Sequence, residues 1–161
     1  KIIAGNNGNE ELPKLVDSES HFISAEHVHL LSTRDHLPFT FTPHVVSHGP
    51  IKNLAIELYY EKTRALYSSD LDTVEPLEVE SSLVQGLPTN RKFDIICLEA
   101  NYDEERLNEY LLAHPTDSHA AGNLRHISEQ SAYKYISTHL KENGVYIPLH
   151  ASRSFGTFFQ E

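Results

Sequence analysis

Four short apolar runs in this sequence each end in a side chain that can bind a metal ion or transfer a proton. The runs and their terminal residues are Phe39–Ser47 with His48, Ala65–Ser69 with Asp70, Phe93–Leu98 with Glu99, and Val145–Leu149 with His150. Layered α/β proteins bind ligands where buried strands end and polar loops begin. The pattern therefore predicts an α/β fold with one site, which belongs to a metal-dependent hydrolase or to a remnant of one.

Length and composition are those of an ordinary globular domain. The chain has 161 residues, so we expect a single domain over residues 1–161, with a poorly structured lead-in over residues 1–20. Cys97 is the only cysteine and cannot form a disulfide within the chain. No apolar stretch approaches the ~20 residues of a membrane span. We expect a cytoplasmic protein with no membrane partner.

Charge and residue usage narrow the possibilities further. The formal net charge is −10, which argues against a broad basic face for duplex nucleic acid. The chain holds eleven histidines and no methionine. Without an initiator methionine, the sequence is expected to be a processed or trimmed chain, or part of a longer one.

Apolar periodicity predicts a series of strands and helices. Phe39 and Phe41 alternate with threonines, the period-two pattern of a strand, and Pro38 and Pro43 place that strand at a sheet edge or a bulge. The expected strands are His21–Leu31, Leu37–Val46, Leu54–Tyr60, Arg64–Ser69, Arg91–Leu98 and Val145–Leu149. Helices are expected at Glu10–Val16, within Val74–Gly86, over Asp103–Leu112, and from the N-cap Ser128 to Lys141, with Gly144 as C-cap. A loop is expected from Pro115 to Asn123.

His48 and Asp70 become informative only as a pair. Alone, each is a common turn residue, and Asp72 is an alternative to Asp70. A hairpin between their strands would bring an imidazole and a carboxylate to one edge of the sheet. Imidazole and carboxylate together form the ligand set of Zn, Mn or Fe.

Five short segments occur in an order that resembles the second half of a metallo-β-lactamase-fold hydrolase. The segments are Ser47-His48-Gly49, Tyr67-Ser68-Ser69-Asp70, Leu98-Glu99-Ala100-Asn101-Tyr102-Asp103, His126-Ile127-Ser128-Glu129-Gln130-Ser131-Ala132 and Leu149-His150-Ala151-Ser152. The likeness covers about residues 22–155. It is closest to the phosphodiesterase and nuclease side of that superfamily, which includes ribonuclease Z and especially the WalJ-type exonuclease-like branch.

The resemblance implies a role for each matching position. His48 and His150 correspond to histidines that bind one metal ion each, and Asp70 corresponds to the aspartate that bridges two ions. His126 corresponds to the histidine that faces the scissile phosphate, and Glu99 to the acid that orients it. A histidine held by a carboxylate is expected to stay protonated near neutral pH and to assist the leaving group.

The sequence departs from the family pattern in two places. The signature His-x-His-x-Asp-His, which provides most of the metal ligands, is absent. The nearest string is His27-Val28-His29 followed by Asp35-His36, and we interpret these as surface or packing residues. Arg125 also stands where the family has a glycine before the histidine.

The resemblance implies a metallo-β-lactamase-like αββα sandwich, of which this chain supplies mainly the C-terminal βα half. The implied cofactor is Zn or Mn, two ions in the complete fold, and the implied substrate is a phosphodiester: a nucleotide or a single-stranded nucleic acid end. The expected protein partner is the missing N-terminal half, or a second copy on the exposed sheet face. Two alternatives stay open: a degenerate, non-catalytic module used for binding or assembly, and an unrelated histidine-rich metal-binding protein.

Overall fold

The computed structural model describes residues 3–6, 21–24, 40–80 and 92–158. Five of its strands form one sheet in the order β3-β4-β5-β6-β7. Their bounds are Thr40–His48 for β3, Ile51–Tyr60 for β4, Thr63–Ser68 for β5, Phe93–Glu99 for β6 and Leu140–Leu149 for β7. Strands β1 (Ile3–Asn6) and β2 (His21–Ser24) pair in parallel in a separate two-stranded sheet. No helix in the described part of the chain is both long and apolar enough to cross a membrane.

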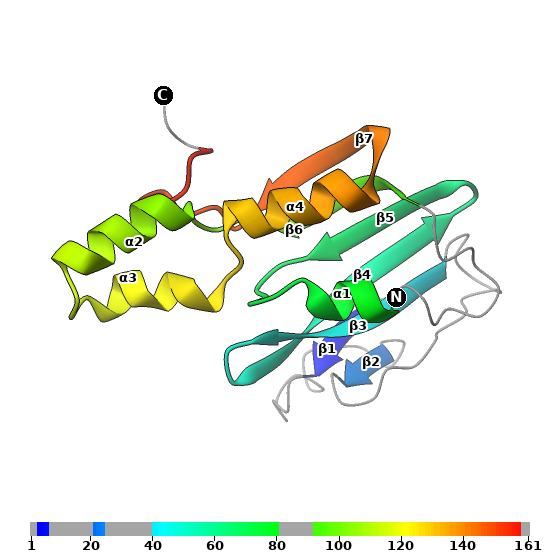
Figure 1. Cartoon of the computed structure of the whole chain (residues 1–161). Coiled ribbons are helices and arrows are strands. Elements are labelled where there is room, and N and C mark those ends of the chain that lie inside the picture. Colours follow the sequence, from blue (N-terminus) through cyan, green and yellow to red (C-terminus); the bar gives the residue numbers. More distant parts are fainter. Residues whose placement is uncertain (1–2, 7–20, 25–39, 81–91, 159–161) are drawn as a thin grey trace.

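Among the described residues, four helices and one short 3-10 turn accompany the sheet. They are α1 (Glu75–Glu80), α2 (Glu104–Ala113), α3 (Ser118–Gly122), η2 (Asn123–Arg125) and α4 (Glu129–His139). Asp103 caps α2 and Ser128 caps α4, each by accepting a hydrogen bond from a backbone N–H three residues on. Helices α1 and α4 lie on the same face of the sheet, whereas α2 and α3 lie beyond its edge (Figure 1).

The sheet topology brings the four predicted strand ends to one edge. Strands β3, β4 and β5 form an antiparallel meander, so β3 and β5 run in the same direction. Strand β6 is parallel to β5, and β7 is parallel to β6. The carboxyl ends of β3, β5, β6 and β7 therefore meet, which is the geometry that parallel strands need in order to share a site.

The main core lies between the sheet and its two covering helices. Leu66, Ile96 and Leu98 point from β5 and β6 into this layer and are 0–2% exposed. They pack with Leu77 of α1 and with the buried face of α4, which comprises Ala132, Tyr135 and Ile136. The i, i+3, i+4 spacing of that face is the one the sequence predicts.

Most predicted elements are present, with two differences. Within the expected loop from Pro115 to Asn123, Ser118–Gly122 form α3 and Asn123 begins η2, because the Asp117 side chain accepts from two backbone N–H groups and Ala120 packs into a small second core. Helix α4 ends at His139, so Gly144 is not its C-cap; Leu140 already pairs with Phe93 in the sheet. Strand β3 lies at an edge of the five-stranded sheet, as its prolines indicated.

The N-terminal predictions fall largely on residues that the structure does not describe. Within the expected lead-in over residues 1–20, residues 3–6 form a strand; the expected helix Glu10–Val16 lies outside the described residues. The expected strand His21–Leu31 is described only at His21–Ser24, where it is extended. His27, His29, Asp35 and His36 also lie outside the described residues.

Candidate metal centre

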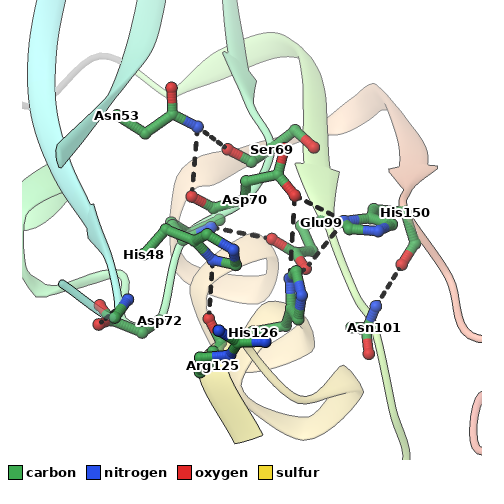
Figure 2. A network of polar contacts seen from close by, with 12 residues as sticks. His48, Asn53, Ser69, Asp70, Asp72, Glu99, Asn101, Arg125, His126 and His150 are labelled. Atoms are coloured by element: carbon green, nitrogen blue, oxygen red, sulfur yellow. Dashed lines mark hydrogen bonds and ion pairs between the residues drawn. The ribbon is translucent and has the colours of Figure 1, made fainter. Parts of the chain in front are cut away.

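Two carboxylates and two imidazoles converge at the carboxyl edge of the sheet. Their ligand atoms, one each from Asp70, Glu99, His126 and His150, all lie within 4.8 Å of one another. Asp70 follows β5, Glu99 ends β6 and His150 follows β7, while His126 lies between η2 and α4. Figure 2 shows the four side chains pointing toward a common centre from these separate elements.

Asp70 and His150 face each other on the open side of the cluster. The distance from His150 Nδ1 to Asp70 Oδ1 is 2.9 Å, and both side chains are nearly half exposed. Both residues have left-handed backbone, with φ of 54° at Asp70 and 51° at His150. Aspartate and histidine tolerate this region better than most residues, and it turns the chain sharply as each strand ends. Of His48, Asp70 and His150, which the sequence predicts to converge, the structure brings Asp70 and His150 into contact.

Glu99 and His126 form the buried side of the cluster. The Glu99 side chain is fully buried, and its Oε1 contacts His126 Nδ1; its Oε2 accepts from the backbone N–H of Leu71 at 3.0 Å. The predicted contact between Glu99 and His126 is therefore confirmed. Glu99 Oε1 also lies 3.5 Å from His150 Nδ1, so the buried side of the cluster contacts its open side.

Burial reverses the protonation expected for the Glu99–His126 pair. Burial, with a contribution from the Asp70 charge, raises the pKa of Glu99 to about 8. Burial, helped by the neighbouring His150 and His48 rings, lowers the pKa of His126 to about 4. These shifts favour a protonated Glu99 carboxyl beside a neutral His126 imidazole, the opposite of the expectation that His126 stays protonated near neutral pH.

His48 lies beside the cluster but is not one of the four clustered ligand residues. Its ring centroid is 4.6 Å from that of His126, and its Nδ1 contacts the backbone carbonyl of Arg125 at 3.1 Å. A ring whose Nδ1–H donates to a carbonyl keeps Nε2 as an acceptor, which is how metal-binding histidines are commonly oriented. The structure thus brings His48 to the correct edge, next to His126.

Two buried or half-buried asparagines hold the sharp turns that carry Asp70 and His150. Asn53 Nδ2 donates to the carbonyls of Ser69 and Asp70 at 2.9 and 3.3 Å. Asn101 Nδ2 donates to the carbonyl of His150 at 2.7 Å. The sequence predicts no role for either asparagine. Asn101 lies in one of the five family-like segments, whereas no local signal marks Asn53.

Asp72, the alternative to Asp70, serves the backbone instead. Its Oδ2 accepts from the N–H of Gly49 at 3.2 Å, and Asp72 is not a member of the ligand cluster. Gly49 has φ of 58°, the conformation that a glycine after a strand-end histidine allows. Asp72 therefore supports the turn after β3.

The chemistry of the cluster fits a divalent cation. Glu99 Oε1 and His126 Nδ1 are buried and contact each other, and neither makes a hydrogen bond to any further described residue. Buried polar atoms usually have partners, and a cation would satisfy both while neutralising the carboxylates. Two imidazoles with two carboxylates form a donor set for Zn or Mn. Asp70, Glu99, His126, His150 and the adjacent His48 are the residues that could hold such an ion.

Comparisons by sequence find no relative, whereas comparisons by structure find several. No model of a known protein family matches the chain, and no curated protein sequence matches it. The metallo-β-lactamase-fold protein YhfI from Bacillus subtilis superposes with a TM-score of 0.59 and 16% identity over 96% of this chain and 52% of its own. The short form of human tRNase Z matches with a TM-score of 0.51 and 13% identity over 83% of this chain and 45% of its own.

A third similar structure is a candidate Zn-dependent hydrolase of the metallo-β-lactamase superfamily from Thermotoga maritima. It matches with a TM-score of 0.53 and 14% identity over 99% of this chain and 61% of its own. At these identities the similarity defines the fold: the chain has the α/β architecture of metallo-β-lactamase-fold proteins. It spans about half the length of the structures that it matches.

Proposed function

We propose that this chain carries part of the active site of a metal-dependent phosphodiester hydrolase, on the nuclease side of the metallo-β-lactamase fold. The observation that carries the proposal is the cluster of Asp70, Glu99, His126 and His150, whose ligand atoms lie within 4.8 Å of one another. The structural similarity to tRNase Z, together with the resemblance of the sequence segments to the WalJ-type branch, supports the choice of a phosphodiester. A cytoplasmic location remains a prediction.

In this proposal Asp70, His150 and His48 hold divalent ions, Zn or Mn. A bound ion supplies an activated water and neutralises charge on the non-bridging phosphate oxygens. Asp70 and His150 suit this role because they lie on the exposed side of the cluster and touch each other. His48 suits it because its Nδ1 is engaged by a carbonyl, which leaves Nε2 available.

His126 and Glu99 would deliver a proton to the leaving group. The raised pKa of Glu99 and the lowered pKa of His126 favour a protonated carboxyl beside a neutral imidazole, so the pair would hold one transferable proton. His126 would donate the proton on its Nε2 to the leaving alkoxide while its Nδ1 takes the proton of the adjacent Glu99. The pair then carries one proton fewer, and the alcohol leaves neutral.

The partner we propose is the missing half of the sandwich. The face of the sheet opposite α1 and α4 carries exposed apolar side chains in register: Leu58 beside Ala65, and Val145 beside Ile95. The two halves of such a fold pack face to face, and a half-core must be buried against something. The described ligands also fall short of the four or five donors that each of two ions requires.

Metal binding by this chain tests the proposal. Titration with Zn or Mn, followed by calorimetry, should show a site that Asp70→Ala or His150→Ala weakens at least tenfold, because each removes a direct ligand. The matched control is His114→Ala, which removes an exposed histidine at the end of α2. Equal affinity in His150→Ala and His114→Ala would contradict the assignment.

Turnover of bis(p-nitrophenyl) phosphate separates the remaining possibilities. The chain alone is expected to bind metal without robust turnover, since its ligand set is incomplete. In an assembly that is active, His126→Ala should lower turnover far more than metal content; loss of both would make His126 a ligand. Robust turnover by the monomeric chain would reinstate His27, His29, Asp35 and His36 as ligands and end the half-fold interpretation. Metal binding without turnover in the complete assembly would favour the non-catalytic module.

A further inference from the structure

Arg125 places a guanidinium at the rim of the candidate metal centre. It is the last residue of η2 and directly precedes His126, and its backbone carbonyl contacts His48 Nδ1. Figure 2 shows its side chain beside His126. The family that the sequence resembles has glycine at this position, so the arginine is a feature of this chain.

The stem of Arg125 is held in place by two glycines. A Cβ on Gly49 would lie 3.3 Å from Arg125 Cδ, closer than most such contacts, so glycine leaves room for the arginine stem. On the other side, Arg125 Nε donates to the carbonyl of Gly122 at 3.5 Å, and a Cβ on Gly122 would lie 3.5 Å from Nη2. The side chain therefore runs between the turn after β3 and the end of α3.

The Arg125 guanidinium has donors to offer and, in the described part of the chain, no carboxylate that pairs with it. Among the described residues Arg125 makes no ion pair, and the residue is exposed. A guanidinium is always charged, has five N–H donors and no acceptor, and so cannot bind a metal ion. Its fork matches two oxygens of a phosphate. In a chain of net charge −10, a cation held at this rim stands out as a site for an anion.

We propose that Arg125 binds a second phosphate of the substrate, adjacent to the phosphodiester that reaches the cluster. This inference rests on the proposed function and deepens it, because it selects a substrate with at least two phosphates. A single-stranded oligonucleotide end meets that requirement, whereas a cyclic mononucleotide, with one phosphate, does not.

The position of Arg125 favours the second phosphate over the scissile one. His126 lies between Arg125 and Glu99 along the site, and its ring is 4.6 Å from both His48 and His150. The Arg125 stem instead leaves the cluster toward Gly49 and Gly122. A phosphate at the guanidinium would therefore lie outside the group of three histidines, next to a phosphodiester held at the cluster.

Binding of a fluorescein-labelled hexathymidylate to the zinc-loaded chain, measured by fluorescence anisotropy, tests this proposal. Arg125→Gln should raise the Kd about tenfold, the loss expected for one charge-assisted contact. The slope of log affinity against log salt should fall by about 0.7, as for one phosphate contact on a single strand. The control Lys62→Gln removes the same charge at the β4–β5 turn, at the opposite edge of the sheet, and should change the Kd less than twofold.

Competition with bis(p-nitrophenyl) phosphate, which has a single phosphate, completes the test. Its inhibition constant should be unchanged in Arg125→Gln, and zinc affinity should also be unchanged, which shows that the site is intact. The proposal is overturned if Lys62→Gln weakens oligonucleotide binding as much as Arg125→Gln does, or if Arg125→Gln also weakens binding of the single-phosphate competitor. It is also overturned if the wild-type chain does not bind the hexathymidylate.

The two proposals fail in different ways. One outcome is that the chain binds zinc, the diester competes, and the oligonucleotide Kd is the same in wild type and Arg125→Gln. This outcome would overturn the role of Arg125 and support the proposed function. Oligonucleotide affinity that depends on Arg125 in a chain that binds no metal would overturn the proposed function and support an anion-binding role of Arg125.

Discussion

At the scale of single residues, the site depends on two sharp turns that strand geometry alone would not make. Asp70 and His150 both have positive φ, a conformation that costs free energy for any residue with a Cβ. The amides of Asn53 and Asn101 hold the carbonyls of these two residues, and Asn101 is only 4% exposed. The asparagines therefore hold the backbone from which the candidate ligands Asp70 and His150 project.

Asn101→Ala is expected to weaken metal binding although every ligand remains. Without the amide, the carbonyl of His150 loses its 2.7 Å hydrogen bond and the turn relaxes, so affinity should fall about 10- to 100-fold, as for other residues that support metal ligands. Calorimetric titration with Zn measures this change. Asn143→Ala, which removes an exposed asparagine in the first half of β7, should bind Zn like the wild type. Unchanged affinity in Asn101→Ala would contradict the positioning role.

At the scale of elements, a buried ionic group ties three strands together on the helix-covered face. Glu57 of β4 accepts from Arg64 Nε of β5 at 2.6 Å, and its Oε2 lies 3.5 Å from His44 Nε2 of β3. All three residues are buried, and the Arg64 guanidinium also lies 4.2 Å above the centre of the Phe93 ring. Breaking a buried pair of this kind leaves a charge without a partner, which is costly.

The stability of the chain should fall in acid because of Glu57. Burial opposes ionisation of Glu57, but hydrogen bonds and charges from His44 and Arg64 outweigh it and hold the pKa of Glu57 below its usual value. The ionised carboxylate therefore contributes stability above the unfolded pKa of about 4.3, and this contribution disappears as the pH falls through the lower folded pKa. Urea unfolding between pH 7 and pH 3 measures the loss.

The substitution Glu57→Gln tests the source of that acid sensitivity. The variant should lose about 1–3 kcal/mol at pH 7 and show a flatter dependence of stability on pH below 5, because the titrating group is gone. The exposed Glu61→Gln at the β4–β5 turn should behave as the wild type. An undiminished pH dependence in Glu57→Gln would assign the acid sensitivity to other carboxylates.

At the scale of the whole molecule, one face of the sheet lacks a covering layer among the described residues. Strand register aligns two rows of side chains on it: Leu58, Ala65, Ile95 and Val145 in one, and Ile56, Tyr67, Cys97 and Ile147 in the other. Leu58, Tyr67, Val145 and Ile147 are 36–53% exposed, and a shallow apolar hollow lies between Leu58, Tyr60, Thr63 and Ala65. Apolar patches of this kind mark surfaces that bind another protein layer.

The isolated chain is therefore expected to associate through this face. Size-exclusion chromatography with light scattering should give a mass above the 18.3 kDa of the monomer, and Leu58→Lys should shift the chain toward the monomer by placing a charge in the centre of the face. Leu112→Lys is the matched control, since Leu112 is 84% exposed on α2, away from the sheet. A wild-type monomer, or equal effects of both substitutions, would count against the uncovered face as an interface.

The sequence by itself determined the strands, the two long helices and the chemistry of the strand ends. Alternating apolar residues and caps such as Ser128 are short-range signals, and they are present at β3, α2 and α4 as predicted. The residues that follow or end the strands, His48, Asp70, Glu99 and His150, could also be selected because their side chains differ from the apolar runs before them. The contact between Glu99 and His126 needed the family resemblance, since 27 positions of chain separate them.

Only the tertiary structure decided which of these residues contact each other and how burial shifts their pKa values. Helix α3 has five residues, too few to be stable alone, and it forms because Ala120 packs with Leu107 and Phe155. The roles of Asn53 and Arg125 depend on contacts across 16 residues or more, which no local pattern reveals. The lowered pKa of His126 follows from its burial beside two other imidazoles, and burial is set by long-range packing. Strand register aligns the site at one edge of the sheet and the apolar rows on one face. This register arises from pairings between distant segments, whereas periodicity in the sequence describes each segment only by itself.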